Sequence, residues 1–261
     1  MSLKITILGC GHSAGTPAIG NHWGNCDPDE PKNRRTRASV LVQSSNANLL
    51  VDTGPDLRTQ INRTDVQMID AVIYTHAHSD HITGIDELRF YRMKYKRVTD
   101  IYATNDTMDE LKRRFDYMFE TRADGIYPQV INPHIIADDA IYKKMRIHDI
   151  EMTPYAQNHG TMTSLGYRFG DVAYSTDFVD LDDRAIETIK GVHTWIADGC
   201  GYKMNDNKVH ASLKKLYAFN ERIGAQRVII THMPPGMDYQ TVMNETPDGF
   251  EPAYDGMVIE A

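Results

Sequence analysis

The sequence predicts an α/β fold in which mixed β-sheets are flanked by helices. Short apolar runs typical of buried strands alternate with segments of helical periodicity, for example at residues 49–52, 56–63 and 70–75. Polar residues with ligand chemistry follow these runs directly, which is where α/β folds gather their sites. A chain of 261 residues with 41% hydrophobic content can bury a large core, and we expect residues 1–261 to form a single domain.

The composition narrows the range of partners. A net charge of −8 argues against nucleic acid, because nucleic-acid binding relies on neutralising phosphates with Lys and Arg. Cys10, Cys26 and Cys200 are too few and too scattered for a disulfide framework, which favours a cytoplasmic location. No apolar run approaches membrane-spanning length, and we expect residues 1–8 to be neither a signal peptide nor an anchor. A small-molecule substrate fits best, and a homodimer is left open.

In the first half of the chain, the predicted strands are 3–8, 38–42, 49–52 and 70–75. Small residues at 9–17 predict a loop whose backbone approaches a neighbour closely. Prolines make 23–37 irregular, and helical periodicity is expected at 56–63, 85–91 and 107–120. Residues 121–149 carry no clear pattern and are interpreted as an excursion over the site.

The second half is richer in strands. Predicted strands cover 150–155, 164–169, 172–175, 194–198 and 227–231, and the second and third of these resemble a hairpin joined at Gly170 and Asp171. A short helix is expected at 183–190. An amphipathic helix is expected at 210–222, with Gly224 as its C-terminal cap.

The segment 75–81 has the spacing of a metal site. His76 and His78 alternate onto one side of an extended segment, and a turn after Ser79 can direct Asp80 and His81 toward a neighbouring point. The segment therefore suits two adjacent metals. The alternative, a surface loop that happens to be rich in histidine, is disfavoured because clustered polar groups are costly to bury without partners.

Three further ligand candidates each follow a predicted strand: His159, Asp177 and His232. A single histidine at a strand end is more often an ordinary hydrogen-bonded residue than a ligand. Together with the segment 75–81, however, they supply seven candidate ligands from separated strand ends.

The H-x-H-x-D-H pattern, preceded by a strand and followed by Gly84, resembles the metallo-β-lactamase superfamily. The resemblance implies a four-layer αββα sandwich and two divalent cations, zinc or manganese. It assigns His76, His78 and His159 to one metal and Asp80, His81 and His232 to the other, with Asp177 bridging. Two cations so placed can share a hydroxide and clamp a substrate's oxygens, which is the chemistry of a hydrolase, with Asp80 as a catalytic residue.

Other residues are expected to assist these ligands. The resemblance places Asp52 where a carboxylate accepts the second ring N–H of a ligand histidine, although a turn cap is the alternative. It also makes His210 the acid that protonates the leaving group, a role that suits an imidazole; a simple polar cap is the alternative. Arg34, Arg35 and Arg37 could bind a substrate phosphate or form a solvated loop.

These features are similar to the phosphodiesterase side of the superfamily, in particular to the phosphoribosyl 1,2-cyclic phosphate phosphodiesterases of phosphonate breakdown. The expected function is hydrolysis of a cyclic or otherwise small nucleotide-like phosphodiester. The chain departs from that branch because its N-terminal segment offers only Cys26 where a Cys-rich zinc site is expected. Alternatives are a lactonase or thioesterase-type acyl hydrolase, a tRNA 3′-processing nuclease, which the acidic balance disfavours, and a metal-binding accessory protein without turnover.

Overall fold

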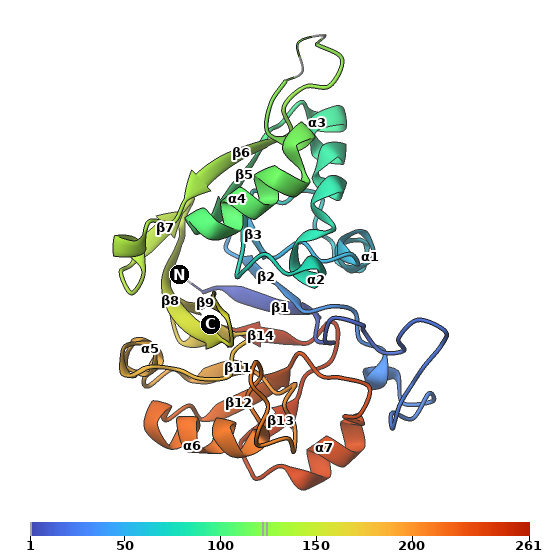
Figure 1. The fold of residues 1–261 in the computed structure, drawn as a ribbon, viewed down its shortest axis with the longest axis vertical. Helices are drawn as coiled ribbons and strands as arrows, with labels where there is room; N and C mark the ends of the chain where they lie inside the picture. The colour runs from blue at the N-terminus through green and yellow to red at the C-terminus, as the bar shows by residue number, and fades with distance from the viewer. Residues whose placement is uncertain (1, 122, 124) are drawn as a thin grey trace.

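The computed structural model describes the chain except for residues 1, 122 and 124. Within the described residues, the strands form two seven-stranded sheets (Figure 1). The first sheet has the order β14-β1-β2-β3-β4-β5-β6 and consists of β1 (Lys4–Gly9), β2 (Ser39–Gln43), β3 (Asn48–Val51), β4 (Ala71–Ile73), β5 (Thr99–Ala103), β6 (Ile131–Ile135) and β14 (Val258–Glu260).

The second sheet has the order β13-β12-β11-β10-β9-β8-β7. Its strands are β7 (Met145–Ile147), β8 (Ile150–His159), β9 (Met162–Phe169), β10 (Val172–Ser175), β11 (Thr194–Asp198), β12 (Arg227–Thr231) and β13 (Phe250–Pro252). The predicted hairpin is present, because β9 and β10 pair antiparallel.

Helices cover the outer faces of both sheets (Figure 1). On the first sheet lie α1 (Leu57–Asn62), α2 (Ser79–Ile82), α3 (Arg89–Tyr95) and α4 (Asn105–Arg114), with the short 3-10 helices η2 (Ile85–Leu88) and η3 (Asp116–Met118). On the second sheet lie α5 (Asp183–Ile189) and α6 (Leu213–Ile223), with α7 (Tyr239–Glu245) beside β13. The 3-10 helices η1 (Pro31–Asn33) and η4 (Asp138–Ala140) lie in connections. The αββα sandwich is thereby confirmed.

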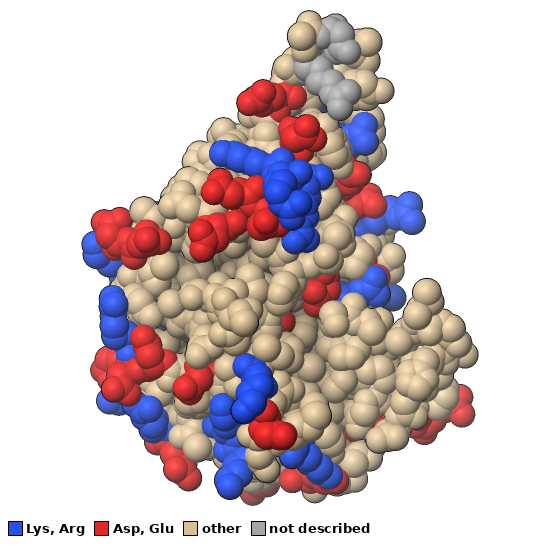
Figure 2. All heavy atoms as spheres, viewed as in Figure 1, with Lys and Arg blue, Asp and Glu red and all other residues tan. Residues whose placement is uncertain are grey.

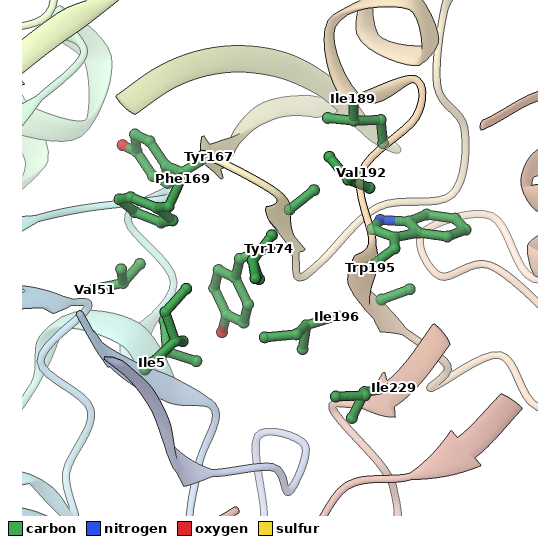
Figure 3. Close-up of a cluster of buried hydrophobic side chains, with 14 of the residues drawn as sticks. Ile5, Val51, Tyr167, Phe169, Tyr174, Ile189, Val192, Trp195, Ile196 and Ile229 are labelled. Carbon is green, nitrogen blue, oxygen red and sulfur yellow. The ribbon is translucent and has the colours of Figure 1, made fainter. Parts of the chain in front are cut away.

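The inner faces of the two sheets share one hydrophobic core. Val40 and Val42 of β2 face this core, while Leu41 between them faces the helices of the first sheet. Figure 3 shows Ile5 and Val51 of the first sheet beside aromatic side chains of the second. Because both faces of the central strands are buried, these strands read as continuous apolar runs, which made them easy to predict.

The sequence prediction missed several elements. Residues 121–149, interpreted as an excursion, contain β6 and β7, although residues 122 and 124 lie outside the described part. β6 is an edge strand with Pro133 inside it, and proline is tolerated at an edge because no ladder partner is lost. β5, α7, β13 and β14 were not predicted. The helix expected at 107–120 begins at Asn105, ends at Arg114, and is followed by η3.

Charged side chains form no dominant patch of one sign on the face that Figure 2 shows. Acidic and basic side chains are interspersed there around a centre of uncharged residues. Among the described residues, no helix has both the length and the apolar character that crossing a bilayer requires.

Candidate metal centre

The candidate ligands meet because their strands end at the same edges of the sheets. β3 and β4 are parallel, and so are β10, β11 and β12, so their carboxyl ends lie side by side. The residues after these ends are Asp52, the segment 76–81, Asp177 and His232, while His159 ends β8.

His76, His78, His159 and Asp177 form one ligand set, with ligand atoms within 4.8 Å of one another. His159 Nε2 lies 3.3 Å from His78 Nδ1 and 3.6 Å from Asp177 Oδ1. His76 Nε2 lies 3.9 Å from the same oxygen. His76 and His159 are buried and His78 is exposed, so the site opens to solvent beside His78.

Asp80, His81 and His232 form the second set. Asp80 Oδ2 lies 3.4 Å from His81 Nε2 and 3.5 Å from His232 Nε2. The other oxygen of Asp177, Oδ2, lies 3.1 Å from His81 Nε2 and 3.4 Å from His232 Nε2. Asp177 therefore presents one oxygen to each set, which is the arrangement of a bridging carboxylate.

In the first set, burial and neighbouring charges fix the protonation states of His76 and Asp177. Burial, together with neighbouring His81, lowers the pKa of His76 well below its usual range, so its imidazole is neutral and able to ligate. Burial opposes ionisation of Asp177, but His232 and His81 hold its pKa well below the usual range of a carboxyl. The bridging position thus carries a carboxylate at neutral pH.

Asp52 holds the orientation of the second set. Its Oδ2 lies 2.7 Å from His81 Nδ1 and accepts a hydrogen bond from the Thr75 hydroxyl, while its Oδ1 accepts one from the Thr75 N–H. With Nδ1 engaged, His81 presents Nε2 to the centre. This is the contact that the sequence analysis expected of Asp52.

The donor set fits two divalent cations. The Nε2 atoms of His76, His81 and His232 are buried and have no hydrogen-bond partner, and unpartnered buried nitrogens aimed at carboxylates are costly unless an ion binds them. Imidazole and carboxylate ligands suit zinc and manganese alike.

His210 lies against both sets. Its ring centroid is 5.2 Å from that of His159 and 5.1 Å from that of His232. Its Nδ1 lies 2.7 Å from Asp198 Oδ2, which leaves Nε2 as the free nitrogen. Burial lowers the pKa of His210, but the carboxylate of Asp198 outweighs this effect and raises the pKa to about 9.

The helix predicted over 210–222 begins three residues after His210. Ser212 caps α6 by accepting a hydrogen bond from the Lys215 N–H, and Ala211 N–H donates to Phe178 O. These bonds keep residues 210–212 outside the helix, so His210 is positioned by Asp198 rather than by helical geometry. Gly224 forms the predicted left-handed cap.

The matches to known proteins agree with this geometry. The family model of the Beta-lactamase superfamily domain matches residues 47–233, which include all seven candidate ligands. The chain belongs to the metallo-β-lactamase superfamily. A crystal structure described as a new diphosphatase from the PhnP family aligns with a TM-score of 0.87 and 30% identity, covering 100% of this chain and 98% of that one.

Two named proteins are also similar in sequence. The probable metallo-hydrolase YhfI of Bacillus subtilis is 24% identical over 89% of this chain and 87% of its own length. A protein named octanoyltransferase from Porphyromonas gingivalis is 26% identical over 98% of this chain, but the match spans only 51% of that protein.

The three arginines do not come together. Arg34 is exposed and lies over the Trp23 ring at 4.8 Å. Arg35 is only 2% exposed, and its Nη2 donates to Asn33 Oδ1 and to Met237 O. Because Arg35 is buried, a substrate has no access to its guanidinium. The guanidinium instead holds the interior of the 23–37 segment together.

Of these three arginines, Arg37 lies beside Gly54. It pairs with Asp56 at 3.2 Å and is half-buried. A Cβ atom placed on Gly54 would lie 3.5 Å from Arg37 Cβ and 2.6 Å from the carbonyl oxygen of Asp80. Glycine at position 54 thus lets Arg37 and the Asp80 backbone approach from two sides.

Cys26 lies apart from this centre. Among the described residues it belongs to no close group of three or more His, Cys, Asp or Glu ligands. Its thiol donates to Pro235 O at 3.2 Å, and Asn33 contacts Asp238 nearby. Hydrogen bonds hold this segment where a Cys-rich zinc site was considered.

Sequence reasoning missed two polar residues of the site. Asp198 ends a strand that was predicted, so the rule that found Asp177 could have found it. His12 lies in the loop 9–17, where its backbone N–H donates to Met233 O and its Nδ1 accepts from Ala14 N. Burial lowers the pKa of His12, and the positive charge of nearby His232 lowers it further, so the ring is neutral with Nε2 protonated.

Proposed function

We propose that the protein is a metal-dependent hydrolase of a small phosphodiester, cyclic or nucleotide-like. The supporting observation is the position of His210, which lies against both ligand sets and has its Nδ1 bound to Asp198. A proton donor beside a two-cation site suits cleavage of a bond whose leaving group departs as an alkoxide.

Seven residues would hold the cations: His76, His78, His159, Asp80, His81, His232 and the bridging Asp177. Bound divalent cations would lower the pKa of water and polarise phosphoryl oxygens. Asp52 fixes the ring of His81, and Asp198 fixes the ring of His210. The side chains around Asp177 keep its two oxygens directed at the two sets.

The proton for the leaving group comes from His210 Nε2. With a pKa of about 9, this imidazole is protonated at neutral pH and can serve as an acid at once. Arg37, whose guanidinium pairs with Asp56, is the arginine proposed to donate a charge-assisted hydrogen bond to a phosphate oxygen. In this proposal Asp80 acts through the cations that it helps to hold, and His210 acts on the leaving group.

A diphosphate is the second candidate substrate. Its support is the 30% identical PhnP-family structure, which is described as a diphosphatase. Both candidates require cleavage of a P–O bond and differ in the leaving group, an alkoxide or a phosphate. An acyl substrate has weaker support, because the octanoyltransferase match spans about half of that protein.

A substrate panel tests the proposal. The protein, loaded separately with zinc and manganese, is assayed on a ribose cyclic phosphodiester, a nucleoside diphosphate and a lactone. We expect the highest kcat/KM on the phosphodiester. Asp177→Ala should show no turnover above background on any of the three substrates. A preference for the diphosphate would select the second candidate, and turnover of the lactone alone would refute phosphoryl chemistry. The cytoplasmic location remains a prediction.

A further inference from the structure

A second possible metal site overlaps the proposed centre. Cys200, His210 and His232 each offer a ligand atom, and these three atoms lie within 4.8 Å of one another. Cys200 follows the end of β11 by two residues and is 9% exposed, and His232 is buried. We propose that these three residues form a zinc site that inhibits the enzyme when it is filled.

The ligand chemistry of this group differs from that of the proposed centre. A thiolate with two imidazoles is a ligand set typical of zinc, and a thiol that coordinates a metal is deprotonated, with its proton released to solvent. The proposed centre offers only imidazoles and carboxylates. The cysteine group therefore selects zinc or cobalt over manganese or magnesium, which prefer oxygen ligands.

The residues around the group are arranged as they are in metal sites. Asp198 binds His210 Nδ1 at 2.7 Å, which leaves Nε2 to serve as a ligand in a carboxylate–histidine–metal arrangement. The other oxygen of Asp198 accepts the Cys200 N–H at 2.8 Å and so fixes the backbone that carries the thiol.

His232 provides an independent observation. Both of its ring nitrogens are buried, and neither has a hydrogen-bond partner. The closest approach of its Nδ1 to a carboxylate is 3.7 Å, to Asp198 Oδ1. Nε2 faces Asp80 and Asp177 of the proposed centre, so Nδ1 is the nitrogen that remains for an ion held with Cys200 and His210. A buried ring nitrogen without a partner is costly, and ligation relieves that cost.

Filling this site conflicts with turnover. His232 belongs both to the group with Asp80 and His81 and to the group with Cys200 and His210, and its two ring nitrogens allow it to serve an ion in each. The ion held with Cys200 would occupy Nε2 of His210, the nitrogen that donates the proton. The inhibitory effect rests on the proposed function, whereas the existence of the site does not.

The first experiment measures metal binding without turnover. Protein holding two equivalents of zinc is titrated with Co²⁺, and near-ultraviolet absorption reports thiolate-to-cobalt charge transfer. We expect the band to appear with the third equivalent in the wild type and in Cys26→Ser, and to be absent in Cys200→Ser. Absence of the band from the wild type, or its persistence in Cys200→Ser, would overturn the site.

The second experiment measures inhibition. The two-zinc enzyme is assayed on its best phosphodiester while further Zn²⁺ is added. Loss of the acid predicts a decrease of about tenfold or more in the wild type and in Cys26→Ser, while Cys200→Ser and Cys200→Ala keep their activity. Equal inhibition of all four proteins would overturn the inhibitory role. If no substrate is turned over, the proposed function fails while the cobalt band still decides the site.

Discussion

Replacing Asp198 by asparagine tests the origin of the proton donor. The substitution keeps the shape of the side chain but removes the charge that raises the pKa of His210 to about 9. Without that charge, burial and the nearby His232 lower the pKa, and it returns to its ordinary value of about 6.5 or below. The difference of about 2.5 pKa units corresponds to about 3.4 kcal/mol.

The effect on rate follows from the protonated fraction of His210. At pH 8 that fraction is about nine-tenths with a pKa of 9 and about one in thirty with a pKa of 6.5. Turnover of a substrate with an alkyl leaving group should therefore fall about 30-fold at pH 8 in Asp198→Asn and change little at pH 6. The alkaline limb of the pH–rate profile moves from about 9 to about 6.5, because an acid acts only below its pKa.

The assay compares kcat/KM on an alkyl and on a p-nitrophenyl phosphodiester from pH 5.5 to about 9.5, which brackets both pKa values. The p-nitrophenolate group leaves without a proton, so kcat/KM of Asp198→Asn on the p-nitrophenyl substrate should keep the pH profile of the wild type. His210→Ala should show the same selectivity with its metal content unchanged. Asp180→Asn, an exposed carboxylate, serves as the control. An unshifted alkaline limb in Asp198→Asn, or equal losses on both substrates, would refute the acid role of His210.

Three further predictions concern the ligands, the arginines and His12. Asp177→Ala and Asp80→Ala should each abolish turnover and lower metal content by elemental analysis while the fold survives; wild-type activity in either would contradict the two-metal assignment. Arg35→Met should reduce the free energy of unfolding by about 2–3 kcal/mol in urea melts with KM unchanged, because two buried acceptors lose a charged donor. Arg37→Ala should raise KM severalfold with stability nearly unchanged. Equal effects of the two variants on KM and on stability would contradict a structural role for Arg35 and a substrate-binding role for Arg37. His12→Ala should raise KM at constant metal content, and loss of metal would instead make His12 a ligand.

The ligand set was predictable because its signals are local. A buried parallel strand shows itself as an apolar run, and a polar residue directly after such a run lies at the carboxyl edge of the sheet. His76, His78, Asp177 and His232 all follow this rule, and the structure brings them together. Asp198 follows the same rule at the end of β11.

The predictions that were wrong concern features that depend on contacts between distant parts of the chain. The burial of Arg35 is set by Met237, 202 residues away in sequence, and no local pattern distinguishes Arg35 from exposed Arg34. The start of α6 was misplaced for a similar reason. Ala211 has a good helix propensity, but its N–H is bound to Phe178 O, and tertiary contacts override propensity.

The backbone conformation at Asp177 could not be predicted from the pattern of residue types. Its φ is 52°, in the left-handed region that favours glycine, and such a conformation costs about 1–3 kcal/mol in a residue with a side chain. Glycine would remove that strain but would supply no carboxylate. The Ser164 hydroxyl donates to Asp177 O, and the Thr176 hydroxyl donates to Asp177 Oδ2, each at 2.7 Å. Asp52 and His232 also have positive φ values, of 64° and 57°. The surrounding sheets thus stabilise strained backbone at three residues of the centre, which is why the two oxygens of Asp177 can face two different ligand sets.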